Sequence, residues 1–182
     1  MASAIVSGCA AVLRQALERP GQQTSAALVK ALLINGAEVI GDEFKTGFGK
    51  VNLRNSVLMA LRDPEHGGYE EGGPLRQDMT VSIPVRDLKN RGLKATLVWS
   101  DARGEVLQNE LELAIHRDRD HPDPDHRKAM DTKNNVLQVE WQDISASSAK
   151  IEIRAKRITF DPQFFAVGWM YTGVEGKSAL IC

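Results

Sequence analysis

A two-residue alternation of apolar and polar side chains runs through Leu93-Lys94-Ala95-Thr96-Leu97-Val98-Trp99. This period is typical of a β-strand with one buried face, because successive side chains of a strand point to opposite sides. The same period recurs at 79–85 and 110–115, and short apolar runs follow at 136–141, 150–155 and 164–171. Several short strands without an intervening helical pattern predict an antiparallel, jelly-roll-like β-sandwich.

The first 62 residues have a helical pattern instead. Residues 1–13 carry no charge, and apolar or small side chains lie on every side of their helical wheel. Such a helix is typical of the middle of a larger core. A break at Pro20-Gly21 ends it, and two shorter helices follow, one ending at Asn35-Gly36 and one near 56–61. About 60 residues bury too little surface to be more than marginally stable alone. We therefore expect this part to belong to a larger domain or to pack on the sandwich.

Composition divides the chain further. Residues 63–77 include a run rich in glycine, proline and acidic side chains, which predicts a linker. The expected organisation is a helical part at 1–62, the linker at 63–77, the sandwich at 78–173 and an unassigned tail at 174–182. The predicted class is α+β.

The charge balance excludes some partners. The 182 residues contain 23 Lys and Arg against 24 Asp and Glu, a net charge of −1. Without a basic excess, binding to nucleic acid or to a membrane surface is not expected. Cys9 and Cys182 form no disulfide framework. The first basic residue, Arg14, follows the leading apolar run, which argues against a signal peptide, and the run is too short to span a bilayer. Localisation stays open.

Three segments of the helical part resemble, in order, the subtilisin-like serine proteases (subtilases). Met1-Ala2-Ser3-Ala4-Ile5-Val6-Ser7-Gly8 resembles the segment that follows the family's catalytic serine, with Ala4 in place of a proline. Residues 27–37 look like the next family helix, and Gly47-Phe48-Gly49-Lys50-Val51-Asn52-Leu53 looks like the turn before the closing helix of the catalytic domain. The resemblance implies that residues 1–62 are the helical remnant of a subtilisin-like α/β catalytic domain.

The strand region is similar to the carboxy-terminal sandwich of one branch of the same family. The similar segments are Leu97-Val98-Trp99-Ser100-Asp101, Asn109-Glu110-Leu111-Glu112-Leu113, Asn134-Asn135-Val136 and Gln163-Phe164-Phe165-Ala166-Val167. The resemblance implies a serine endopeptidase with a Ser-His-Asp acyl-enzyme mechanism, whose partners are the remainder of the catalytic domain and a protein or peptide substrate. The triad would precede Met1, so this chain is expected to be inactive alone. It would contribute no catalytic, cofactor-binding or metal residue, and its sandwich would stabilise the catalytic domain.

Some residues invite a chemical interpretation of their own. Ser3 is a serine near a helix start, but its position favours a small structural residue. His116, His121 and His126 lie among acidic and basic side chains and suggest a metal or general-base cluster. The alternative interpretation is a solvated charged loop between two strands. His66 falls in the expected linker and is expected to be exposed.

Two further alternatives concern calcium and carbohydrate. Asp101, Asn109, Glu110 and Glu112 supply the oxygen ligands that calcium prefers, although Glu110 and Glu112 also fit the polar face of a strand. No cofactor is expected apart from this calcium candidate. The tryptophans favour core packing over a carbohydrate platform; they are Trp99, Trp141 and Trp169.

A second function of a different class fits the same sequence. The chain would then be a non-catalytic β-sandwich interaction module whose leading apolar helix docks on a partner. An uncovered apolar surface of that size favours association.

Overall fold

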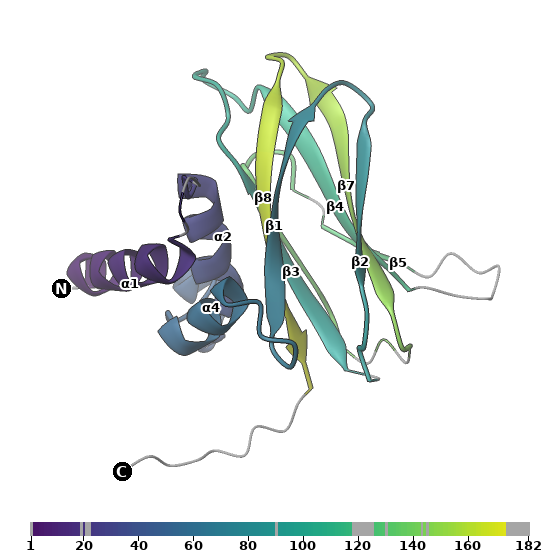
Figure 1. Cartoon of the computed structure of the whole chain (residues 1–182). Coiled ribbons are helices and arrows are strands. Elements are labelled where there is room, and N and C mark those ends of the chain that lie inside the picture. The colour runs from purple at the N-terminus through teal and green to yellow at the C-terminus, as the bar shows by residue number, and fades with distance from the viewer. Residues whose placement is uncertain are drawn as a thin grey trace, which may run out of the picture.

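The computed structural model describes residues 2–18, 20, 23–89, 91–117, 126–129, 131–142, 144 and 146–173 (Figure 1). Helices come first: α1 (Ala2–Leu17), α2 (Ala26–Gly36), α3 (Glu43–Thr46) and α4 (Leu53–Ala60). Strands follow: β1 (Gly67–Leu75), β2 (Thr80–Val85), β3 (Gly92–Trp99), β4 (Asn109–Arg117), β5 (His126–Lys128), β6 (Val136–Trp141), β7 (Ala149–Ile158) and β8 (Gln163–Thr172). The expected tail at 174–182 lies outside the described residues.

The strands form two antiparallel sheets that pack face to face, which confirms the predicted β-sandwich. One sheet has the order β1-β8-β3-β6 and the other β2-β7-β4-β5. Apolar side chains from the two inner faces fill the space between them, among them the fully buried Leu97, Trp99, Leu113 and Ile153. This core is built by the alternating residues of the sequence, since every second side chain of a strand faces inward.

Strand β3 is buried along its whole length, although its sequence alternates. Its inner side chains face the second sheet, and its outer ones, Lys94, Thr96 and Val98, lie under the helices. Helix α2 crosses β3 and β8 on that outer face (Figure 1). The close approach of α2 to β8 uses Gly168, where a Cβ atom would come within 2.8 Å of Leu32 Cδ2.

The residues expected to form a linker contain strand β1 instead. Gly67–Leu75 pairs with β8 through an antiparallel register that runs from Gly67 opposite Met170 to Leu75 opposite Gln163. The glycines make room for aromatic rings of β8: a Cβ atom on Gly72 would lie 2.5 Å from Phe165 Cζ, and one on Gly68 would lie 3.0 Å from Trp169 Cζ2. Glycine in this segment therefore reflects close packing in the sheet rather than a loop, and the helical part is joined to the sandwich without a linker between them.

Helix α1 departs most from expectation. We expected the uncharged leading helix to be enclosed, yet within the described residues only Leu13 and Leu17 of this helix are buried. They pack in a small cluster with Leu28, Leu32 and Met59. The remainder of α1 projects away from the sandwich, with the N-terminus at its far end (Figure 1). The larger core that the sequence predicts around this helix is absent from the described part of the chain.

Candidate functional site

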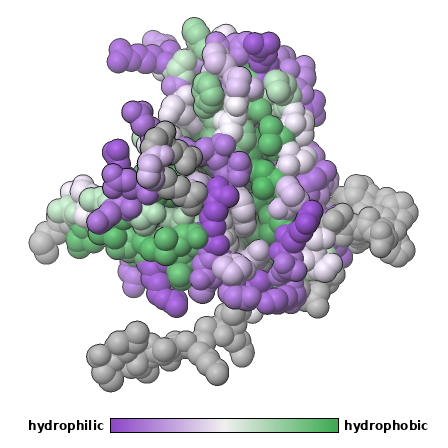
Figure 2. Space-filling model, viewed as in Figure 1, coloured by the Kyte–Doolittle hydropathy of each residue, from purple (hydrophilic) through white to green (hydrophobic). Residues whose placement is uncertain are grey.

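The projecting part of α1 is the first candidate site. Residues Ala2–Val12, which we call the α1 surface, carry no acidic or basic side chain, and the first charge on the helix is Arg14. Ile5, Val6 and Val12 are exposed, Ile5 to 61%. Figure 2 shows hydrophobic residues gathered on this projecting region. Exposed apolar patches of this kind mark interaction sites.

Only the carboxyl end of α1 is anchored. Leu13 has no exposed surface and Leu17 has 4%, and both pack against the cluster that includes Met59 and Ala60 of α4. At 1.5 Å per residue, Ala2–Val12 extends about 15 Å beyond this anchor. The α1 surface is thus a helical projection, held at its carboxyl end, that can enter a partner from the side of the molecule.

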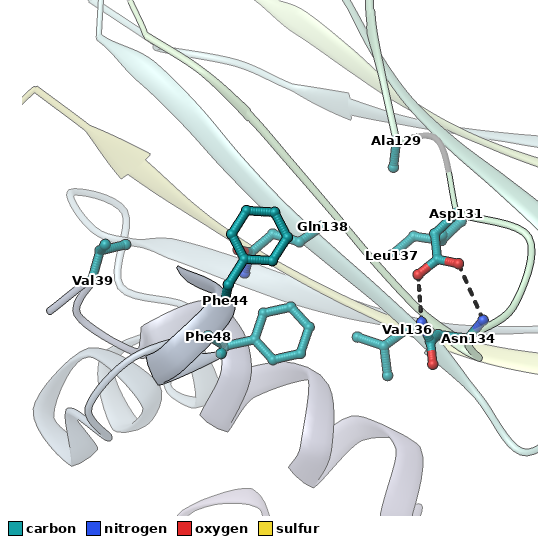
Figure 3. Close-up of a pocket in the computed structure, with 10 residues that line it drawn as sticks. Val39, Phe44, Phe48, Ala129, Asp131, Asn134, Val136, Leu137 and Gln138 are labelled. Atoms are coloured by element: carbon teal, nitrogen blue, oxygen red, sulfur yellow. Dashed lines mark hydrogen bonds between the residues drawn. The ribbon is translucent and has the colours of Figure 1, made fainter. Parts of the chain in front are cut away.

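A second candidate is a groove beside β6 with both apolar and polar lining residues (Figure 3). It has a volume of about 590 Å³ and is called here the β6 groove. Its lining consists of Val39, Phe44, Gly47, Phe48, Ala129, Asp131, Asn134, Val136, Leu137 and Gln138. Figure 3 shows the rings of Phe44 and Phe48 on one side of β6, with Ala129 and Asp131 on the other. Phe44 is 93% exposed, so one wall of the groove is an uncovered aromatic ring.

The aromatic wall sits on a loop that is closed at its base. Glu38 and Lys50 exchange two backbone hydrogen bonds of 2.9 and 2.8 Å. Gly49 has a φ of +101°, and a Cβ atom there would lie 2.0 Å from the carbonyl oxygen of Glu38, so only glycine fits. Asn52 then caps α4 by accepting a hydrogen bond from Asn55 N. The Gly-Phe-Gly-Lys-Val-Asn run is explained by this closed loop and helix cap.

Asp131 is the ionisable residue of the groove lining. Its carboxylate accepts hydrogen bonds from Asn134 Nδ2 at 2.6 Å and from the backbone N–H of Lys133 at 2.8 Å. The Asn134 side-chain bond, followed by the Lys133 amide, lowers the pKa of Asp131 below its ordinary value. A lowered pKa keeps the carboxylate charged at neutral pH, so the groove carries one fixed negative charge.

The residues that suggested catalysis are not brought together. Ser3 is exposed on α1, and within the described residues it has no hydrogen bond to an imidazole or a carboxylate. His66 bonds Asp63 near the end of α4, with 2.9 Å between Nδ1 and Oδ1. His116 and His126 lie on the second sheet, far along the chain from Ser3.

The histidine cluster forms in part. His116 and His126 face each other on β4 and β5 with their rings stacked at 5.3 Å, whereas His121 lies outside the described residues. His116 Nε2 is 3.4 Å from Glu152 Oε1. Burial lowers the pKa of His116, an effect only partly opposed by Glu152. In the described parts of the chain, no three His, Cys, Asp or Glu side chains are placed to hold a metal ion.

The calcium candidates are engaged in hydrogen bonds that organise one end of the sandwich. The two carboxylate oxygens of Asp101 accept from the backbone N–H of Gln108 at 2.7 Å and of Asn109 at 2.8 Å. The buried Asn109 amide donates to the Phe160 carbonyl and to Gln163 Oε1, and it accepts from two backbone N–H groups. These bonds tie the loop after β3 to the loop before β8.

The remaining candidates have structural roles. Glu110 accepts a hydrogen bond from Lys156 Nζ, and Glu112 accepts one from Lys128 Nζ, on the polar face of the second sheet. Trp99 and Trp141 are buried in the core, and Trp169 packs against it. The three rings therefore form no exposed platform for carbohydrate. Sequence reasoning missed the β6 groove, because its wall depends on α3 and on a free strand edge that no residue pattern marks.

Comparisons with known proteins assign no family. No family model matches the chain, and no curated protein matches it. A crystal structure of a Pseudomonas putida prolyl-4-hydroxylase is similar with a TM-score of 0.32 and 12% identity, over 94% of this chain and 78% of that one. A likeness this low carries no argument about fold or function.

The comparisons correct the subtilase resemblance drawn from the sequence. Neither the family models nor the curated proteins yield a subtilase. The 47–53 segment and the strand segments that suggested the family have local explanations in the closed 38–50 loop, the Asn109 hydrogen bonds and the sandwich core. The description of the chain as a protease fragment, and of residues 1–62 as a catalytic-domain remnant, is therefore withdrawn.

None of the helices in the described residues has the length and apolar character needed to cross a membrane.

Proposed function

We propose that this chain is a non-catalytic interaction module that presents the α1 surface to another polypeptide. The observation that carries the proposal is the exposure of an uncharged helix, Ala2–Val12, on a molecule whose helices α2 and α4 pack on the sandwich or on each other. The strand order β1-β8-β3-β6 and β2-β7-β4-β5 supports a jelly-roll-like sandwich as the platform. In this proposal the α1 surface binds the partner polypeptide, and the sandwich holds the helix in place.

The chemistry of the α1 surface specifies its partner. No side chain between Ala2 and Val12 is charged, and apart from Ser3 and Ser7 all are apolar or small, so most of the helix surface gains from removal of water. A second copy lying alongside would cover one face and leave the opposite face in solvent. A partner with an uncharged apolar groove that encloses the helix covers all of it. We therefore assign the α1 surface to a protein of different sequence with such a groove.

Site-specific photocrosslinking tests the proposal directly. A photoreactive amino acid is placed at Ile5 in the full chain, expressed in its native host. The matched control places it at Val106, which is 72% exposed in the loop after β3. The expected result is one specific heterologous crosslink from position 5 that is absent from position 106. The crosslinked protein is then purified and titrated with the unmodified chain.

The titration separates docking from chance proximity. We expect Ile5→Asp to weaken binding at least 10-fold, because it places a charge inside an apolar groove. Val106→Asp should leave the affinity unchanged, and circular dichroism should show both variants folded. Equal crosslinking from the two positions, crosslinking only to a second copy, or equal affinity of Ile5→Asp and wild type would each overturn the proposal.

A further inference from the structure

The outer edge of β6 directs backbone groups away from the sheet in a regular row. β6 pairs with β3 on one side, and no described strand pairs with it on the other. The Trp99 N–H donates to the Asn135 carbonyl, which makes 99 and 135 a hydrogen-bonded pair of the antiparallel ladder. Since such pairs alternate with non-bonded ones, Leu137 and Val139 bond to β3. The N–H and C=O groups of Val136, Gln138 and Glu140 therefore point away from the sheet.

This backbone row lies along the β6 groove. Val136 and Gln138 present their side chains to the outer face, toward Phe44 and Phe48, and their backbones to the free edge. Phe44 and Phe48 thus form an apolar wall beside these outward donors and acceptors, for which no described strand supplies a partner. Side chains and backbone offer two kinds of contact to the same ligand.

We propose that the β6 groove binds an extended peptide segment of a partner protein by strand addition. The peptide pairs with the outward groups of Val136, Gln138 and Glu140, at about 6.8 Å between successive bonding residues. Its apolar side chains, at alternate positions, pack on Phe44 and Phe48. A lysine or arginine lies at the end next to Asp131, the one ionisable side chain among the lining residues.

An extended peptide fits these features better than a helix or a small apolar ligand. A helix satisfies its own backbone groups and leaves the row at the β6 edge unpaired. A small apolar ligand uses the rings of Phe44 and Phe48 and likewise leaves the backbone groups unused. This site is separate from the α1 surface, so either proposal can fail without the other.

A library of random heptapeptides displayed on phage identifies the preference. Wild-type chain is the target, and Phe44→Ala is the counter-target, since a ring that is 93% exposed can be removed without disturbing the fold. We expect enriched peptides with apolar residues at alternate positions and a basic residue at one end. Failure to enrich any peptide on the wild type over Phe44→Ala overturns the proposal.

Backbone methylation of the best peptide tests the strand geometry. Two versions carry N-methyl groups on alternate residues, in one register or the other. Because only every second amide of an added strand bonds to β6, one version should lose at least 10-fold in affinity and the other should retain it. Equal affinity of the two versions contradicts strand addition.

Variants of the protein complete the test. Gln138→Pro removes an outward N–H and also the side-chain bond from Gln138 to Thr96, whereas Gln138→Ala removes only the side-chain bond. We expect the proline variant to bind at least 10-fold more weakly than the alanine variant. Asp131→Asn should weaken peptides with the basic residue and leave peptides with norleucine in its place unchanged. Phe160→Ala, an exposed ring elsewhere, is the control and should bind as wild type. A dimer in sedimentation that Gln138→Pro abolishes would instead assign the edge to a second copy and overturn the proposal.

Discussion

Thr96 on β3 donates a hydrogen bond of 2.9 Å from Oγ1 to Oδ1 of Asn35 in the last turn of α2, and neither residue has any exposed surface. The same hydroxyl accepts from Gln138 Nε2 at 2.8 Å, and Asn35 Nδ2 donates to Met59 Sδ at 3.2 Å. One chain of bonds thus connects β6, β3, α2 and α4. It fixes the helical layer, which carries both candidate surfaces, on the sandwich.

Asn35→Ala should destabilise the whole chain. The substitution removes both amide bonds and leaves the buried Thr96 hydroxyl without its acceptor, at a cost of about 1–3 kcal/mol. Urea unfolding followed by tryptophan fluorescence measures this loss. In a double-mutant cycle with Thr96→Val, the two effects should not add, because the residues share one bond. Additive losses would mean that the pair does not couple α2 to β3.

Gly168→Val should displace α2 from the sheet. A Cβ atom at this position lies 2.8 Å from Leu32 Cδ2, so a larger side chain overpacks the contact at a cost of about 1–3 kcal/mol. Gly8→Ala is the matched control, since nothing lies within 4 Å of its Cβ position on the exposed part of α1. The control should gain about 0.5–1 kcal/mol of helix stability. Thermal unfolding of both variants checks this; a neutral Gly168→Val would contradict the tight contact.

His116 should make stability decrease in mild acid. Burial lowers its pKa in the folded chain from the ordinary 6.5, with Lys150 and His126 adding to the effect and Glu152 opposing it. As pH falls below 6.5, His116 therefore binds a proton in the unfolded chain but stays neutral in the folded chain. The free energy of unfolding decreases until the pH passes the lower pKa of the folded chain. His116→Gln should flatten this dependence in urea titrations above and below that pH. An unchanged slope would count against a partly buried imidazole whose pKa is lowered.

Asn109→Ala should loosen one end of the sandwich. The buried amide makes four hydrogen bonds to the loops around it, so its removal should cost at least about 2 kcal/mol of unfolding free energy, measured by urea unfolding.

Calcium should not affect stability. Because both carboxylate oxygens of Asp101 already accept hydrogen bonds from backbone N–H groups, adding calcium or a chelator should leave the melting temperature of the wild type unchanged. A calcium-dependent rise in melting temperature would show that Asp101 and its neighbours bind the ion.

The two-residue alternation of apolar side chains could predict the β-sandwich. The sequence did not reveal how β1, α1 and the β6 groove are placed around it. The alternation in β3 located a strand correctly, because the inner positions Leu93 to Trp99 had to be apolar. The glycines of β1 were interpreted as a linker, since sequence does not reveal that Phe165 and Trp169 lie against them. The uncharged sequence of α1 predicted an enclosed helix, and this was wrong for the described chain, where only Leu13 and Leu17 of the helix are buried. The β6 groove could not be predicted from the sequence. Which strand lies at the edge of a sheet depends on the order of the strands in space, and no residue pattern reveals that order.

Hydrogen–deuterium exchange of α1 in the isolated full chain tests the central claim most directly. Amides of Val6–Val12 should exchange at least 10-fold faster than those of Leu28–Leu32 in α2, because the first group lacks packing and the second is held on β3 and β8. Adding the partner identified through Ile5 should slow exchange in α1 and leave α2 unchanged. Protection of α1 equal to that of α2 in the monomeric chain, or no change with the partner, would contradict the account.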